Sequence, residues 1–127
     1  MSIALSVENV KKIYQPESPN PTYALINLSF DVKPGEIFGL LGPNGAGKTS
    51  LISIITTLEK PTAGDVKVFG ESVTLSPQKT KIQIGVVPQE IVSSGFFNLE
   101  EILRYHSGYY GIKENSKRIQ SLLENLK

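Results

Sequence analysis

Eight consecutive residues of this chain have the types and spacing of a phosphate-binding loop. They read Gly42-Pro43-Asn44-Gly45-Ala46-Gly47-Lys48-Thr49 and satisfy every fixed position of the pattern G-x-x-x-x-G-K-[ST]. Glycines let the backbone curl so that successive amide N–H groups converge on one anion. Lys48 can then reach the outer phosphates, and the Thr49 hydroxyl can hold Mg²⁺. This loop, together with the adjoining Ser50, predicts binding of a nucleoside triphosphate.

The residues on either side of the loop supply the context that this chemistry needs. The run 37–41 is β-branched and aromatic, which favours a strand entering the loop. Apolar residues then recur at helical spacing over 51–58, which predicts a helix from Lys48 to about Lys60, where Pro61 ends it. The alternative is a glycine-rich hairpin turn with no ligand. Because strand, loop and helix follow one another, we prefer the phosphate-binding interpretation.

The remaining elements can be placed from alternation and from turn residues. Apolar positions alternate over 3–14 and again over 23–32, which predicts two amino-terminal strands that are solvated on one face. A further strand is expected over 65–69, and Ser76-Pro77 favours a short helix through Lys81. The run 84–87 is short and β-branched enough for a buried parallel strand that ends at Gln89.

The last third of the chain reads as helical. Asn98 followed by Glu101 has the form of a capping box, and a final amphipathic helix is expected around Ile119 and Leu126. His106, the single histidine, falls in the first of these helical patterns and is expected to be solvated. Five aromatic residues nearby suit a core or a partner groove equally well: Phe96, Phe97, Tyr105, Tyr109 and Tyr110.

Composition limits the function classes. A chain of 127 residues has room for one ordinary domain, and its net charge of +1 with no long single-sign run gives no reason to expect nucleic-acid binding. Without cysteine there are no disulfides and no thiolate metal sites. No apolar run approaches the roughly twenty residues of a membrane span, and the amino terminus lacks the pattern of a signal peptide, so a cytosolic location is expected.

The order of these features resembles the amino-terminal part of an ATP-binding cassette (ABC) transporter ATPase subunit. The residues that carry the resemblance are Tyr14, the loop from Gly42 to Thr49, the run Pro61-Thr62-Ala63-Gly64 and the run Val86-Val87-Pro88-Gln89. The likeness spans the whole chain, and the residues of its motifs are most similar to those of the exporter-type cassettes. The implied fold is an incomplete α/β P-loop NTPase: an antiparallel β portion, parallel core strands with the phosphate-loop helix, and the start of an α-helical subdomain.

The resemblance also implies roles for matched residues. Tyr14 would stack on the adenine of ATP, where the simpler interpretation is a half-buried packing residue. Gln89 would contact Mg²⁺ and the attacking water, and Lys48 would act on the phosphates during catalysis. A polar group that follows a parallel strand fits that role for Gln89, although an ordinary strand-end residue would look the same. Residues 1–97 would form the ATP-binding core, and residues 98–127 would begin the helical subdomain.

The expected partners are a transmembrane permease and a second nucleotide-binding domain, on the cytoplasmic face of a membrane. The family's signature and Walker B elements are not found in these 127 residues, so the chain is expected to be an amino-terminal fragment that binds Mg-ATP and barely hydrolyses it. Two alternatives stay open. One is a small P-loop kinase or GTPase, and the other is a short non-catalytic nucleotide-binding module.

Overall fold

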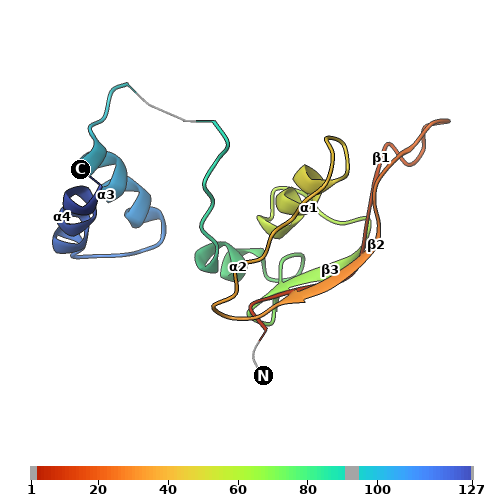
Figure 1. Cartoon of the computed structure of the whole chain (residues 1–127), viewed down its shortest axis with the longest axis horizontal. Coiled ribbons are helices and arrows are strands. Elements are labelled where there is room, and N and C mark those ends of the chain that lie inside the picture. The colour runs from red at the N-terminus through yellow and green to blue at the C-terminus, as the bar shows by residue number, and fades with distance from the viewer. Residues whose placement is uncertain (1–2, 91–94, 127) are drawn as a thin grey trace. The chain divides into compact units, whose positions relative to one another are not determined.

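The computed structural model describes residues 3–90 and 95–126. The chain forms two compact units, residues 1–86 and residues 87–127, and Figure 1 traces the path of the chain through both. The first unit contains the sheet, the phosphate loop and two helices, and the second contains two helices.

An antiparallel sheet forms the framework of the first unit. Its strands are β1 (Leu5–Tyr14), β2 (Thr22–Val32), β3 (Ala63–Val68) and β4 (Glu71–Ser72), in the spatial order β2-β1-β3-β4. The two predicted amino-terminal strands are thereby confirmed. Strand β3 begins two residues earlier than the expected 65–69, because Ala63 pairs with Lys11 of β1.

A β-bulge in β1 decides which side chains of that strand face inward. From Val7 to Val10 the strand advances three residues while its partner β2 advances two, from Phe30 to Leu28. The extra residue is Asn9, which has a φ of 49° and donates its backbone N–H to Ser29 Oγ at 2.8 Å. Because side chains alternate with period two, this insertion moves the residues that follow it in β1 to the opposite face. Two further register shifts against β2 lie between Val10 and Ile13. Val7 and Val10 are therefore both buried although three positions separate them.

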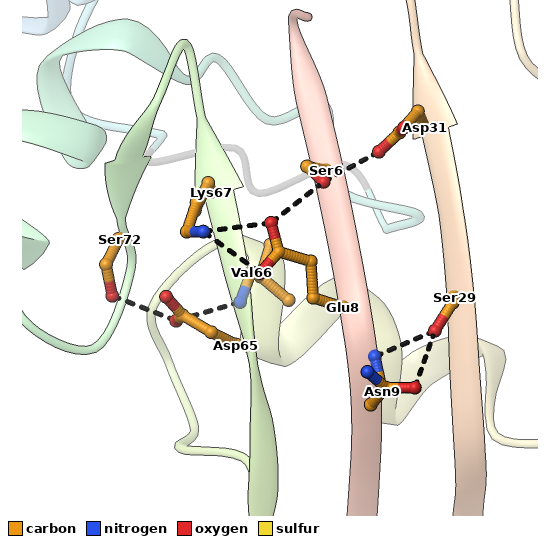
Figure 2. Close-up of polar contacts among 9 residues, drawn as sticks. All are labelled: Ser6, Glu8, Asn9, Ser29, Asp31, Asp65, Val66, Lys67 and Ser72. Atoms are coloured by element: carbon orange, nitrogen blue, oxygen red, sulfur yellow. Dashed lines mark hydrogen bonds and ion pairs between the residues drawn. The ribbon is translucent and has the colours of Figure 1, made fainter.

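The outer face of the sheet is polar and is cross-linked by side chains (Figure 2). The Lys67 ammonium donates to the Glu8 carboxylate at 2.9 Å, which joins β3 to β1. Ser6 Oγ donates to Asp31 at 2.6 Å and joins β1 to β2. The carboxylate of Glu8 raises the pKa of Lys67 above its ordinary value. These contacts are exposed, so they favour the strand register more than they add to stability.

The inner face of the sheet packs against helix α1 (Lys48–Ile55) and contains the hydrophobic core of this unit. Leu51 and Ile54 are the helix residues buried in it, with 1% and 0% of their surface exposed, and Ile55 packs against its edge. The sheet and the segment after β4 contribute the other buried members, which are Val7, Val10, Leu25, Val66, Val68 and Val73. Burial of these side chains fixes the first turn of α1, and with it the phosphate loop, against the sheet.

Helix α1 ends earlier than the sequence indicates, at Ile55 and not near Lys60. Thr57 adopts a left-handed φ of 64°, and its N–H donates to the Ile54 carbonyl while that of Leu58 donates to the Ser53 carbonyl. This pair of hydrogen bonds is a Schellman motif, in which a residue at Thr57's position closes the helix. The motif turns the chain before Pro61 and carries Glu59 back toward the end of β1.

The two predicted parallel strands are wrong for the described residues: 37–41 and 84–88 have no strand structure there. A strand has no hydrogen bonds within itself and needs a neighbour, and among the described residues the sheet contains the four strands β2, β1, β3 and β4 alone. Residues 82–83 instead extend helix α2 (Pro77–Gln83), which begins at the expected Ser76-Pro77. Val87, expected to be buried, has 95% of its surface exposed.

The second unit contains α3 (Leu99–Tyr109) and α4 (Ser116–Asn125). The predicted capping box is confirmed, because Asn98 Oδ1 accepts from Glu101 N–H and Glu101 accepts from Asn98 N–H, both at 2.9 Å. His106 lies exposed in α3 as expected. Phe97 packs edge-on against Tyr105 with ring centroids 5.2 Å apart. Among the described residues, no helix has the length and apolar character needed to cross a membrane.

Candidate functional site

The phosphate loop is anchored to β2 at a position that only glycine can occupy. Gly47 has a φ of 85°, and a Cβ built there would lie 2.2 Å from the carbonyl oxygen of Ala24 in β2. A side chain would therefore collide with backbone that cannot move without disturbing the sheet. The loop before Gly47 is exposed, and a turn closed by the Ala46 N–H and the Pro43 carbonyl at 3.2 Å shapes it. The sequence motif thus forms an exposed loop, and the contact of Gly47 with β2 fixes the point at which the chain enters α1.

The Lys48 ammonium is enclosed by the loop that precedes it. It donates to the Gly42 carbonyl and, at 2.6 Å, to the Pro43 carbonyl. Two carbonyl groups of the loop therefore point to one positive charge, and the Lys48 side chain that carries it is partly exposed. A phosphate oxygen brought to this point would meet that charge, and a charge-assisted contact is roughly twice as strong as a neutral hydrogen bond.

The amino end of α1 is open to an anion. Its N-cap residue is Gly47, no side chain in the described part of the chain caps the first turn, and that turn contains no acidic residue. The N–H groups of a first helical turn have no intrahelical partner and carry the positive end of the helix dipole. The Thr49 side chain is exposed there, and its hydroxyl makes no hydrogen bond within the described part of the chain. Free N–H groups, one ammonium and one free hydroxyl suit a phosphate group with a hard cation.

Tyr14 reaches this same helix end from the last position of β1. Its hydroxyl lies 3.0 Å from Ser50 Oγ, one residue beyond Thr49. The same hydroxyl donates to Glu59 Oε2 at 2.8 Å. The structure therefore brings the expected base-stacking residue and the phosphate loop together, although 36 positions separate Tyr14 from Ser50.

Two residues that sequence reasoning missed, Lys12 and Glu59, surround Tyr14. Lys12 Nζ forms an ion pair with Glu59 Oε2 at 2.9 Å and lies 4.9 Å from the centroid of the Tyr14 ring. The hydrogen bonds that Lys12 and Tyr14 donate hold the pKa of Glu59 below its ordinary value of 4.5. Lys12 shares a strand face with Tyr14, which is a signal visible in the sequence. Glu59 gives no such signal, because the turn after α1 brings it to Tyr14 from 45 positions away.

Gln89 belongs to the second unit, residues 87–127, and is exposed at a bend that follows residues 84–88. The other predicted site residues all lie in the first unit. The role expected for Gln89 toward Mg²⁺ and water stays a prediction.

Comparison with known proteins gives consistent matches. The family model described as ABC transporter matches residues 25–127. The Nod factor export ATP-binding protein I of Cupriavidus metallidurans is 34% identical over 98% of this chain, and the linearmycin resistance ATP-binding protein LnrL of Bacillus subtilis is 38% identical over 94% of it. The chain spans about 40% of the length of these curated relatives.

Solved structures agree with the sequence relatives. A structure described as the ATP binding subunit of an ABC transporter has a TM-score of 0.77 and 30% identity, covering 87% of this chain and 44% of its own. The ATP-binding cassette MJ0796, described as a dimer in a post-hydrolysis state bound to ADP and Pi, has a TM-score of 0.76 and 27% identity. That match covers 94% of this chain and 54% of the other. On the family match, the sequence relatives and the shared α/β P-loop fold, the chain belongs to the ABC transporter family.

Proposed function

We propose that this chain binds Mg-ATP as part of the nucleotide-binding subunit of an ABC transporter. The observation that carries the proposal is the loop at residues 42–47, which encloses the Lys48 ammonium next to an uncapped helix end. Phosphoryl groups are recognised by just such a combination of charge and free backbone N–H groups. The names of both sequence relatives contain the words ATP-binding protein, and the name of the first also contains export. The family match favours neither a kinase or GTPase nor a non-catalytic module.

Each site residue has a role in the proposal. Lys48 and the amides of the loop hold the β- and γ-phosphates, and the Ser50 hydroxyl lies next to them. Tyr14 supplies a face on which adenine stacks. Thr49 is the first-unit ligand for Mg²⁺, and its free hydroxyl is the kind of hard oxygen that this ion prefers. Mg²⁺ keeps several waters and binds through substrate phosphates, so it does not need a cluster of carboxylates.

The family also guides our proposal for Gln89, for the division into subdomains and for the partners of the whole protein. We propose that Gln89 contacts Mg²⁺ and the attacking water, with residues 1–97 as ATP-binding core and residues 98–127 as the beginning of a helical subdomain. A transmembrane permease and a second nucleotide-binding domain are the partners, on the cytoplasmic face of the membrane. The dimer described for one solved cassette and the word export in the names of sequence relatives support this arrangement.

Titration with a fluorescent ATP analogue and Mg²⁺ tests the proposal. Lys48→Ala should weaken binding at least about tenfold, because a hydrogen bond to a charged group is worth roughly 1.5–3 kcal/mol. Lys11→Ala is the matched control, since it removes the same charge from an exposed position of β1. Circular dichroism checks that both variants keep the fold. Equal affinity of the wild type and Lys48→Ala would refute the phosphate-loop assignment.

A further inference from the structure

Three segments meet at the hydroxyl of Tyr14. The hydroxyl comes from the end of β1, Ser50 from the first turn of α1, and Glu59 from the turn that follows α1. The two hydrogen bonds, at 3.0 and 2.8 Å, have ordinary lengths and fix the outer end of the ring. A ring held at its tip from two sides has little freedom to rotate about its side-chain bonds.

Lys12 restrains the same ring from its face. Its ammonium lies 4.9 Å from the ring centroid, within the range of a cation–π contact. It also donates to the Glu59 carboxylate and to the Lys60 carbonyl, both at 2.9 Å, and 14% of the Lys12 side chain is exposed. The cation thus occupies one face of the tyrosine, so a planar ligand would have to stack on the other face.

Glu59 connects these restraints. One oxygen of its carboxylate, Oε2, accepts from both the Tyr14 hydroxyl and the Lys12 ammonium. The Schellman turn at Thr57 delivers this carboxylate to the end of β1. Ionisation of Glu59 is favoured because both neighbours donate to it, so its pKa lies below 4.5.

We infer that Glu59 and Lys12 are positioning residues for the nucleotide base, because together they hold the Tyr14 ring beside the phosphate-loop helix and Lys12 restricts stacking to the ring face that it does not occupy. The inference rests on the proposed function, in which Tyr14 stacks on adenine. Preorganisation lowers the cost of ordering a binding group, so loss of the restraint should weaken recognition of the base without changing recognition of the phosphates.

Binding of two probes separates these effects: a fluorescent ATP analogue and inorganic tripolyphosphate, which has the phosphates without the base, both with Mg²⁺. Tyr14→Ala should lower affinity for the ATP analogue about tenfold, the order expected for one base stacked on an aromatic ring. Glu59→Ala and Tyr14→Phe should each lower it about threefold, since the ring remains but its restraint is lost. Glu59→Gln keeps an acceptor for the hydroxyl and should recover part of the loss. Tripolyphosphate affinity should stay unchanged in all four variants.

Glu8→Ala is the matched control, because it breaks another 2.9 Å ion pair on the same strand but on the outer face of the sheet. It should leave the affinity for both probes unchanged. The combined variant of Tyr14→Phe and Glu59→Ala should lose less affinity for the ATP analogue than the two single variants lose together, because both remove the hydrogen bond between Tyr14 and Glu59. If Glu59→Ala fails to fold by circular dichroism, Tyr14→Phe carries the test, since it removes only the hydroxyl and keeps the ring.

The outcomes distinguish this inference from the function on which it rests. If Lys48→Ala leaves tripolyphosphate affinity unchanged, the proposed function itself fails. If Lys48→Ala abolishes binding but Glu59→Ala and Tyr14→Phe keep wild-type affinity for the ATP analogue, only the positioning role is overturned. Equal losses for both probes in Glu59→Ala would likewise overturn it, because they would indicate a general structural effect.

Discussion

Gly64 occupies the point of closest approach between β3 and the bulge in β1, and replacing it with alanine should destabilise the protein. Its φ is 79°, and an added Cβ would lie 2.4 Å from the backbone oxygens of Glu8 and Asn9. Real Cβ atoms essentially never come closer than 3.0 Å to another heavy atom, so the backbone would have to move. Both oxygens belong to the bulge itself, which is paired with β2 and β3 on either side.

The magnitude follows from three contributions to Gly64→Ala. An alanine in the left-handed region costs about 1–2 kcal/mol. Reduced freedom of the unfolded chain offsets about 0.4–1 kcal/mol of this cost. Forcing extra volume into a packed site costs about 1–3 kcal/mol more. The free energy of unfolding should therefore fall by about 2–4 kcal/mol, a large part of the roughly 5–15 kcal/mol typical of a domain.

Urea unfolding followed by far-ultraviolet circular dichroism measures this change. Gly70→Ala is the matched control: Gly70 has a φ of 85°, but no heavy atom of the described residues lies within 4 Å of an added Cβ. It should lose about 1 kcal/mol or less, the conformational cost alone. If the free energy of unfolding falls by the same amount in both variants, with the same dependence on urea concentration, the collision of an added Cβ with the bulge is refuted. A stable Gly64→Ala protein that has dissolved the bulge should also lose the base-dependent part of ATP affinity, because Tyr14 would change face.

Three further outcomes are expected. Thr57→Gly should raise the free energy of unfolding by about 0.5–1 kcal/mol in urea titrations, because a β-branched residue is strained at the left-handed φ of 64° and its buried hydroxyl has no hydrogen-bond partner among residues 3–90 and 95–126. Unchanged or lower stability would contradict this. Because the pKa of Glu59 is lower in the folded chain than its ordinary 4.5, its stabilising contribution should be present above about pH 4.5 and be lost as the pH falls through the folded value. The difference in melting temperature between the wild type and Glu59→Gln should then shrink from pH 6 toward pH 3, and a difference that grows on acidification would refute the sign. In single-turnover phosphate-release assays with saturating Mg-ATP, the 127-residue chain should hydrolyse no faster than Lys48→Ala, since the sequence has no carboxylate after an apolar strand to polarise the attacking water. Lys48-dependent turnover on the order of once per second would contradict that expectation.

Local patterns in the sequence were sufficient wherever the physical cause is itself local. The phosphate loop needs only glycines and Lys48 at fixed spacing, and the capping box needs only Asn98 and Glu101 three residues apart. The first two strands follow from alternation, and the family follows from the order of these features. The loop and the capping box depend on turns and hydrogen bonds that span a few residues, so the residue types at those positions decide the structure. The alternation of a strand is likewise visible within its own residues, although its pairing partners are not.

Tertiary structure decided everything that depends on partners far away in the sequence. The runs 37–41 and 84–87 have strand-like residues but no strand neighbour within the described chain, and an unpaired strand leaves its backbone groups unsatisfied. The residues that surround Tyr14 could not be predicted from the sequence either. Strict alternation from Val7 would point Tyr14 away from α1, but the extra residue Asn9 reverses the strand's faces and brings its hydroxyl to Ser50. Glu59 contacts Tyr14 because α1 ends at Ile55. Backbone geometry and packing decide where the helix ends, and the pattern of residue types does not.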